Sequence, residues 1–179
     1  MGRYVAFLRG MNLGGRRITN DELRAHFLAM GFTGVQPFLA SGNIVFDSPR
    51  SDPEALSGEI KKGLADALDY LVPTYLRSGQ EVRSIAARQV FTEKQMKTGG
   101  KVQVALFHHP PNEAGRAKVL SLSSKEDRLA IHGRELYWLP RGNFSDTELD
   151  LAAIEKTVGP MTVRTHRTLK RLSAKYLAE

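Results

Sequence analysis

The stretch YVAFLRGMNLGGRR, residues 4–17, holds the two features that decide how the fold begins. Five consecutive apolar residues, from Tyr4 to Leu8, predict a buried strand over about residues 3–8. A glycine-rich loop follows and leads into a helix, because Thr19 and Glu22 have the spacing of a capping box. Gly31 is expected to end this helix. The chain therefore starts as strand, loop and helix.

Two extended runs after the first helix predict a β-hairpin. They are VQPFLA and NIVFDS, and they meet at Ser41-Gly42. Pro37 has no backbone N–H to donate, so the first run is expected at an edge of its sheet. A second helix should begin at Asp52-Pro53, and a further strand is expected over residues 73–77.

The second half of the chain follows the same order. Residues 92–101, TEKQMKTGGK, are polar and contain two glycines, which predicts a linker. Beyond them we expect a strand, a short helix, a hairpin and a helix that begins at Ser145, with Glu148 as its capping-box partner. The expected ranges are 102–107 for the strand, 112–120 for the short helix, and 128–131 and 135–139 for the hairpin. A short extended piece, 161–164, and a C-terminal helix, about 165–177, complete the chain.

This order predicts the fold class α+β, with two tandem ferredoxin-like (split β-α-β-β-α-β) halves plus a C-terminal helix. The predicted halves are residues 1–91 and 102–179, separated by the linker. An internal duplication explains the repeated order economically.

The composition is that of a globular protein with a basic surplus. The chain has 26 Lys and Arg residues and 19 Asp and Glu residues, which gives a net charge of +7. Such a charge attracts phosphates and nucleic acid. The alternative interpretation is that the surplus cations only keep the surface soluble. The absence of cysteine excludes disulfides and thiolate chemistry. No apolar run is long enough to span a bilayer, so we expect a cytoplasmic protein with no membrane partner.

Several motifs together resemble one family. The segments LRGMNLGG, DELRAHFLAMGF and ASGNIVFDS, with TVRTHRT near the end, are similar to an uncharacterised bacterial family known as domain of unknown function 1697. The resemblance implies two ferredoxin-like halves and implies no activity. Where members of the family commonly have TTRNWNT, this chain keeps Arg164 and Thr168 and lacks the aromatic residue and both asparagines.

Topology predicts a candidate binding site. In a split β-α-β-β unit the end of the first strand lies at the same edge of the sheet as the turn between the second and third strands. Two loops should therefore converge and offer an arginine, amide side chains, a hydroxyl and glycine N–H groups, which suit a carboxylate, a phosphate or a carbonyl. The residues are Arg9, Gly10, Asn12, Gly14, Gly15, Ser41, Gly42 and Asn43, with Arg164 and Thr168 added from the resemblance. The alternative interpretation is that these residues only shape the turns.

Other chemistry has weaker support in the sequence. The glycines match neither the Rossmann nor the Walker A pattern, and we expect no cofactor. His108, His109 and His132 could meet as a metal site or could be solvated turn residues. His26 and His166 are isolated and are expected at the surface.

The sequence thus favours a non-catalytic protein that binds an anionic small molecule or nucleic acid. One alternative is a small-molecule enzyme that uses Arg9, Asn12, Ser41 and Asn43. Another is a protein-assembly module. The sequence leaves the oligomeric state open.

Overall fold

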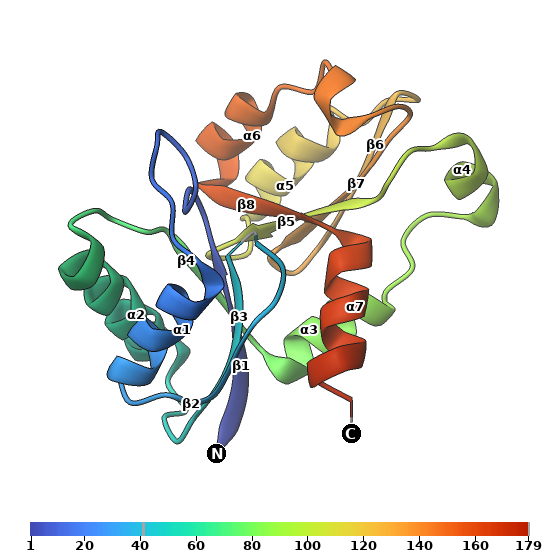
Figure 1. The fold of residues 1–179 in the computed structure, drawn as a ribbon. Coiled ribbons are helices and arrows are strands. Elements are labelled where there is room, and N and C mark those ends of the chain that lie inside the picture. Colours follow the sequence, from blue (N-terminus) through green and yellow to red (C-terminus); the bar gives the residue numbers. More distant parts are fainter. Residues whose placement is uncertain (41, 179) are drawn as a thin grey trace. The chain divides into compact units, whose positions relative to one another are not determined.

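The computed structural model describes residues 1–40 and 42–178 of the chain, and this part forms two compact units (Figure 1). The first unit contains residues 1–83 and the C-terminal residues from 172 onward, and the second contains residues 84–171. Together they hold seven α-helices and two four-stranded antiparallel sheets, so the predicted α+β class is confirmed. None of the helices in the described ranges is long and apolar enough to cross a membrane.

The first unit is built on one antiparallel sheet of strand order β2-β3-β1-β4. Strand β1 is central and pairs antiparallel with β3 and with β4, while β2 lies at an edge. Pro37 ends β2, so the predicted edge position is confirmed. The strands are β1 (Gly2–Leu8), β2 (Thr33–Pro37), β3 (Asn43–Ser48) and β4 (Thr74–Ser78); the helices between them are α1 (Asn20–Ala29) and α2 (Pro53–Leu68).

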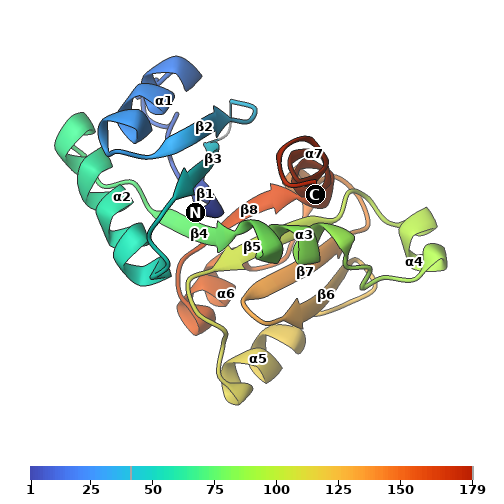
Figure 2. The ribbon, with the colours of Figure 1, turned by 90° about the horizontal axis from the view of Figure 1, so that it is seen from below.

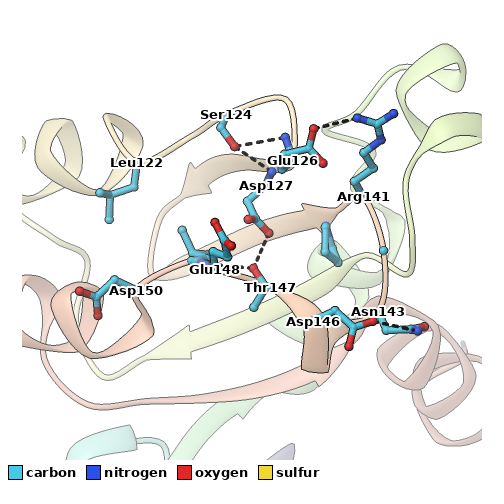
Figure 3. A pocket seen from close by; sticks show the side chains of 13 residues that line it. Leu122, Ser124, Glu126, Asp127, Arg141, Asn143, Asp146, Thr147, Glu148 and Asp150 are labelled. Carbon is cyan, nitrogen blue, oxygen red and sulfur yellow. Dashed lines mark hydrogen bonds and ion pairs between the residues drawn. The ribbon is translucent and has the colours of Figure 1, made fainter.

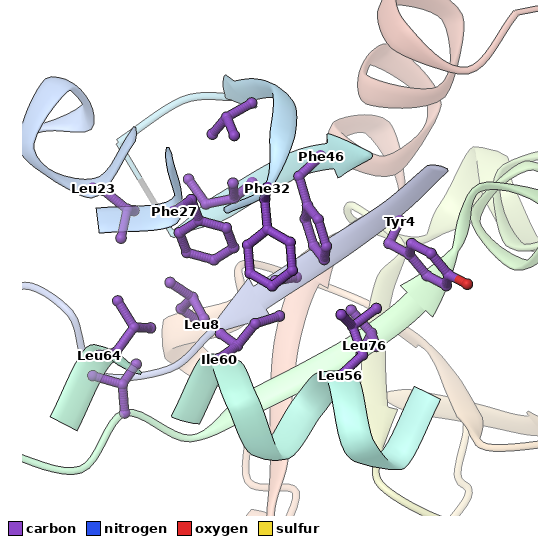
Figure 4. Close-up of a cluster of buried hydrophobic side chains, with 14 of the residues drawn as sticks. Tyr4, Leu8, Leu23, Phe27, Phe32, Phe46, Leu56, Ile60, Leu64 and Leu76 are labelled. Carbon is purple, nitrogen blue, oxygen red and sulfur yellow. The ribbon is translucent and has the colours of Figure 1, made fainter. Parts of the chain in front are cut away.

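One face of this sheet carries the core of the first unit. Side chains alternate along a strand, so Tyr4, Ala6 and Leu8 of β1 point to one face. The apolar stripe of α2 meets them there, and α1 and α2 lie side by side on that face (Figures 2 and 4). Burying each such leucine or isoleucine contributes roughly 1.5–3 kcal/mol. The α2 stripe consists of Leu56, Ile60 and Leu64.

Side-chain caps fix where these helices begin. Thr19 accepts a hydrogen bond from the backbone N of Glu22 at 3.1 Å, and the Glu22 carboxylate accepts one from the backbone N of Thr19 at 2.7 Å. The predicted capping box is therefore confirmed. Asp52 caps α2 in the same way by accepting from the backbone N of Glu54 at 3.0 Å.

The second unit is built on an antiparallel sheet of order β6-β7-β5-β8. Helices α5 and α6 contact each other and share an apolar core with one face of this sheet (Figures 1 and 2). The strands are β5 (Gln103–Phe107), β6 (Asp127–His132), β7 (Glu135–Pro140) and β8 (Met161–Thr165); the helices are α4 (Glu93–Thr98), α5 (Glu113–Leu120) and α6 (Leu151–Val158). Two further helices, α3 (Gly79–Ala87) and α7 (His166–Tyr176), each contain a boundary between the units.

Two segments differ in detail from the sequence-based prediction. The helix expected from Ser145 is wrong, since Phe144–Asp146 forms a 3-10 helix and α6 begins at Leu151 under the cap of Asp150. Thr147 prevents an earlier start, because its hydroxyl accepts from the backbone N of Leu149 at 3.1 Å and so stabilises a non-helical turn. The segment 92–101 contains the short helix α4, whose cap is a Thr92–Gln95 box.

Candidate functional site

The two loops of the predicted site converge in the first unit. The backbone N of Leu8 donates to the carbonyl of Gly42 at 2.8 Å, and Phe7 is paired with Asn43 across β1 and β3. The Asn12 side chain reaches from the first loop to the carbonyl of Ala40 at 3.3 Å. The predicted proximity is therefore confirmed. Ser41 lies outside the described residues.

The two asparagines of this cluster hold the backbone in place. The carbonyl oxygen of the Asn12 side chain accepts from the backbone N of Ile18 at 3.3 Å, so this side chain closes its own loop and also joins it to the second loop at Ala40. Asn43 is fully buried, and its side-chain amide donates to the carbonyl of Phe38 at 2.9 Å. These amide groups are thus engaged in shaping the turns.

The glycines of the cluster serve the same turns. Gly42 has a φ of 73°, and a Cβ there would lie 3.0 Å from the carbonyl oxygen of Leu8, so only glycine fits without displacement. Gly14 and Gly15 also have positive φ angles, 62° and 81°, but a Cβ at either would meet no atom within 4 Å. Their exposed N–H groups are the part of the loop that remains open to a ligand.

Arg164 and Thr168 lie in the second unit, Arg164 on β8 and Thr168 in the first turn of α7. The Arg164 guanidinium donates to the Thr162 hydroxyl at 2.8 Å and to the carbonyl of Val163 at 2.9 Å. Burial lowers the pKa of Arg164 to about 10. The hydroxyl of Thr165 accepts from the backbone N of Thr168 at 3.1 Å and caps the helix. This cap fixes the position of the helical turns that follow.

A cavity of about 40 Å³ lies in the second unit, where five segments meet. One wall is the segment that follows α3, a second is α4, a third is Val102 just before β5, and the others are β7 and the first turns of α7. The residues around it are Arg88, Gln89, Val90, Phe91, Met96, Val102, Tyr137, His166 and Lys170. This cavity was not predicted from the sequence.

Tyr137 provides a buried hydroxyl at this cavity. Its neighbours Leu136 and Trp138 belong to the core beneath α5 and α6, so the alternation of β7 directs Tyr137 to the opposite face of the sheet. The side chain is fully buried, and its hydroxyl has no hydrogen-bond partner among the described residues. Burial raises the pKa of Tyr137 to about 12, Glu135 adds to this effect, and Arg88 opposes it. Arg88 therefore lies close enough to the hydroxyl to act on its pKa, although no hydrogen bond of good geometry joins the two side chains.

His166 forms another wall of the cavity, and its predicted surface position is wrong. Only 8% of the residue is exposed, because the first turn of α7 packs against the sheet and the ring lies 6.0 Å from that of Tyr137. Its Nε2 lies 2.9 Å from the carbonyl of Ile85, and since a carbonyl only accepts, this nitrogen carries a proton. Burial is the main cause that lowers the pKa of His166. The ring is thus a neutral donor to the backbone.

The charged side chains that line the cavity are both cations, and the carboxylate of Glu135, which also acts on Tyr137, lies outside the lining. Arg88 and Lys170 are the ionised side chains among the nine lining residues, and none of the nine carries a carboxylate. The charge of Lys170 helps to lower the pKa of His166, and that of Arg88 helps to lower the pKa of His132. An arginine, a lysine and a phenol can all donate to an oxyanion. Tyr137 is buried, whereas Arg88 and Lys170 are exposed residues at the rim of the cavity.

A second cavity, of about 550 Å³, is acidic, and most of its carboxylates have structural partners (Figure 3). Asp127 accepts from the Trp138 indole and from the Thr147 hydroxyl, both at 2.7 Å. Glu126 pairs with Arg141 at 2.8 Å, and Asp150 caps α6. Within residues 1–40 and 42–178, no group of three or more histidine or acidic side chains is arranged to hold a metal ion.

The fold and the cavity thus define a two-unit α+β protein with a small cation-lined site in its second unit. The chain belongs to the family described as protein of unknown function (DUF1697), whose model matches residues 1–137, as the sequence motifs predict. No curated protein matches the chain. Among solved structures, the conserved bacterial protein SP0830 from Streptococcus pneumoniae is similar, with a TM-score of 0.78 and 19% identity over 99% of both chains. At this identity the likeness shows the fold.

Proposed function

We propose that this protein is a non-catalytic binder of an anionic ligand and that the cavity beside Tyr137 is its binding site. The observation that carries the proposal is a fully buried hydroxyl for which the described residues provide no hydrogen-bond partner of good geometry, at a cavity that Arg88 and Lys170 bound. An unsatisfied buried polar group costs about 1–3 kcal/mol, and a ligand that accepts its hydrogen bond recovers that cost. The two cations select a ligand of negative charge.

The test is a titration of the whole chain with sodium acetate and with inorganic phosphate, followed by calorimetry and by the thermal unfolding midpoint. A ligand that binds only the folded state raises the midpoint as it saturates the site. Lys170→Gln should weaken the binding of the anion at least tenfold, whereas Lys156→Gln, an exposed lysine of α6 in the same unit, should leave it unchanged. If neither anion binds the wild-type chain, the proposal is wrong.

Nucleic acid is the alternative anion, and salt distinguishes it. Binding to a phosphate backbone weakens steeply as salt rises, because counterions are released. Oligonucleotide binding with such a slope, unchanged by Lys170→Gln, would place the ligand on the outer surface instead of in the cavity.

The loop cluster of the first unit is a second candidate for the same function. The N–H groups of Gly10, Gly14 and Gly15 donate no hydrogen bond within the described part of the chain. The guanidinium of Arg16 stacks on the ring of Tyr70 at 4.0 Å, which keeps a cation at this loop. Loss of anion binding in Arg9→Ala, with binding retained in Lys170→Gln, would assign the site to this cluster.

We also propose that both units are ferredoxin-like and arose by duplication of one β-α-β-β-α-β unit. The sheet orders β2-β3-β1-β4 and β6-β7-β5-β8 support this, because each second-unit strand corresponds to the first-unit strand numbered four lower. Each sheet also carries two helices on one face, in corresponding places along the chain. The lack of cysteine supports a cytoplasmic location for the protein.

A further inference from the structure

An open groove adjoins the cavity beside Tyr137. The groove measures about 620 Å³, within the range of small-molecule sites, and is formed by the segment from Gln89 to Glu93 and by α4. Four residues line both spaces, so one ligand can occupy both: Gln89, Val90, Phe91 and Met96.

The shared residues are mainly apolar and partly open to solvent. Met96 is 44% exposed, and Val90 and Phe91 are half-buried. Methionine adapts its shape to a bound apolar group, which suits a groove for a chain or a ring. The cavity therefore suits a charged head. The strip of Val90, Phe91 and Met96 suits an apolar body, while Thr92, Glu93 and Lys97 form the polar remainder of the groove.

The walls of this groove are held in place by backbone contacts. Helix α4 begins under the Thr92–Gln95 capping box, and the backbone N of Gly100 just after it donates to the carbonyl of Pro140 at 2.6 Å. On the other side, the backbone N of Arg88 continues the α3 hydrogen-bond pattern by donating to Ser84 at 3.1 Å. The groove therefore has a defined shape before a ligand binds, which reduces the entropic cost of binding.

We infer that the ligand is a monocarboxylic acid with an apolar body, its carboxylate in the cavity beside Tyr137 and its body in the groove along Val90, Phe91 and Met96. This inference rests on the proposed function. A volume of about 40 Å³ holds about three water-sized groups at roughly 10–15 Å³ each. A carboxylate has three heavy atoms, whereas a phosphate has five, so the size of the cavity favours the carboxylate.

The experiment is a calorimetric titration of the whole chain with straight-chain carboxylates of two to eight carbons, kept below micelle-forming concentrations. Each methylene that enters an apolar groove contributes about 0.8 kcal/mol, so the affinity should rise about fourfold for each added carbon until the groove is full. Hexanamide, which has the same body without the charge, should bind at least tenfold more weakly than hexanoate. Hexyl phosphate should also bind more weakly than hexanoate.

Two variants separate the head from the body of the ligand. Met96→Ser should flatten the dependence on chain length and leave acetate binding unchanged, while Leu122→Ser, an equally exposed apolar residue elsewhere in the unit, should change neither. Tyr137→Phe should weaken every acid by a similar factor, and circular dichroism checks that each variant is folded.

The outcomes are distinct. Binding of acetate with no gain for longer acids would overturn the inference and leave the proposed function standing. Tighter binding of hexyl phosphate than of hexanoate would overturn the carboxylate assignment. Failure of every anion to bind the wild-type chain would overturn the proposed function itself.

Discussion

Replacing Tyr137 by phenylalanine should make the ligand-free protein more stable. The change removes one buried oxygen that has no hydrogen-bond partner among the described residues and keeps the ring, which contacts the rings of His132 and His166 at centroid distances of 5.9 and 6.0 Å. Burying an unsatisfied hydroxyl costs about 1–3 kcal/mol, and the nearby charge of Arg88 recovers part of that cost. We therefore expect Tyr137→Phe to increase the free energy of unfolding by about 1 kcal/mol. For a chain of this size the unfolding midpoint should rise by roughly 2–4 °C.

Tyr4→Phe is the matched control, because it removes the same atom from a similar place. Tyr4 lies on the central strand β1, is 8% exposed, and its hydroxyl donates to the carbonyl of Arg50 at 3.0 Å. Its loss should decrease the free energy of unfolding by about 1 kcal/mol, so the two variants should shift in opposite directions. Urea unfolding followed by circular dichroism measures both. If Tyr137→Phe destabilises the protein as much as Tyr4→Phe does, the Tyr137 hydroxyl is satisfied in the folded state and the case for a ligand there fails.

Three further predictions concern the fold. Gly34→Ala should lower the free energy of unfolding by roughly 1–3 kcal/mol more than Gly14→Ala does. Both positions have φ near +60°, but only at Gly34 would the Cβ collide with the Asp47 carboxylate, which Arg3 holds in place. Equal losses of stability in urea unfolding would contradict this. Asp52→Ala should lower stability by about 1 kcal/mol through loss of the α2 cap, and a thermal midpoint equal to that of the wild type would refute it. Because burial holds the pKa of His166 below 6.5, the unfolded state takes up a proton first as the pH falls, so stability should decline below pH 6.5. The stability of His166→Gln should decline less between pH 7 and pH 5 than that of the wild type. His132 is present in both proteins and contributes equally to both declines. An equal decline in the two proteins would count against a buried neutral His166.

Local signals in the sequence predicted most of the secondary structure and the strand pairing. The Thr19–Glu22 spacing and the Asp52-Pro53 pair fixed two helix starts, because caps act within a few residues of the chain. The convergence of the two first-unit loops followed from strand order alone. The start of α6 was predicted incorrectly because Ser145 and Glu148 have the same spacing as a real cap. Thr147 there is engaged with Asp127, which lies far away in the sequence.

The cavity could not be predicted, because it depends on which face of a strand or helix each residue occupies after packing. Tyr137 lies on the predicted strand 135–139 with no motif around it, and His166 is an isolated histidine at the start of the predicted C-terminal helix. The cap of α7 at Thr165 and the contact of His166 with the Ile85 carbonyl place that histidine inside. Neither contact leaves a pattern in the sequence, since the partner of His166 is a backbone carbonyl that any residue could provide.

The residues that identify this chain by sequence and those that form the cavity are different sets, for a physical reason. A loop motif can be recognised in the sequence when the backbone geometry allows only one residue type at a given position. Gly42 is an example, because a Cβ there would crowd the carbonyl oxygen of Leu8. The engaged side chains of Asn12 and Asn43 likewise account for their own places in the motif without any ligand. The Tyr137 hydroxyl, in contrast, is buried at a cost that the nearby charge of Arg88 offsets only in part. An energetic cost that the fold does not explain points to function more directly than a sequence pattern that the fold explains fully. For this reason we propose the cavity of the second unit, and not the loop motif, as the ligand site.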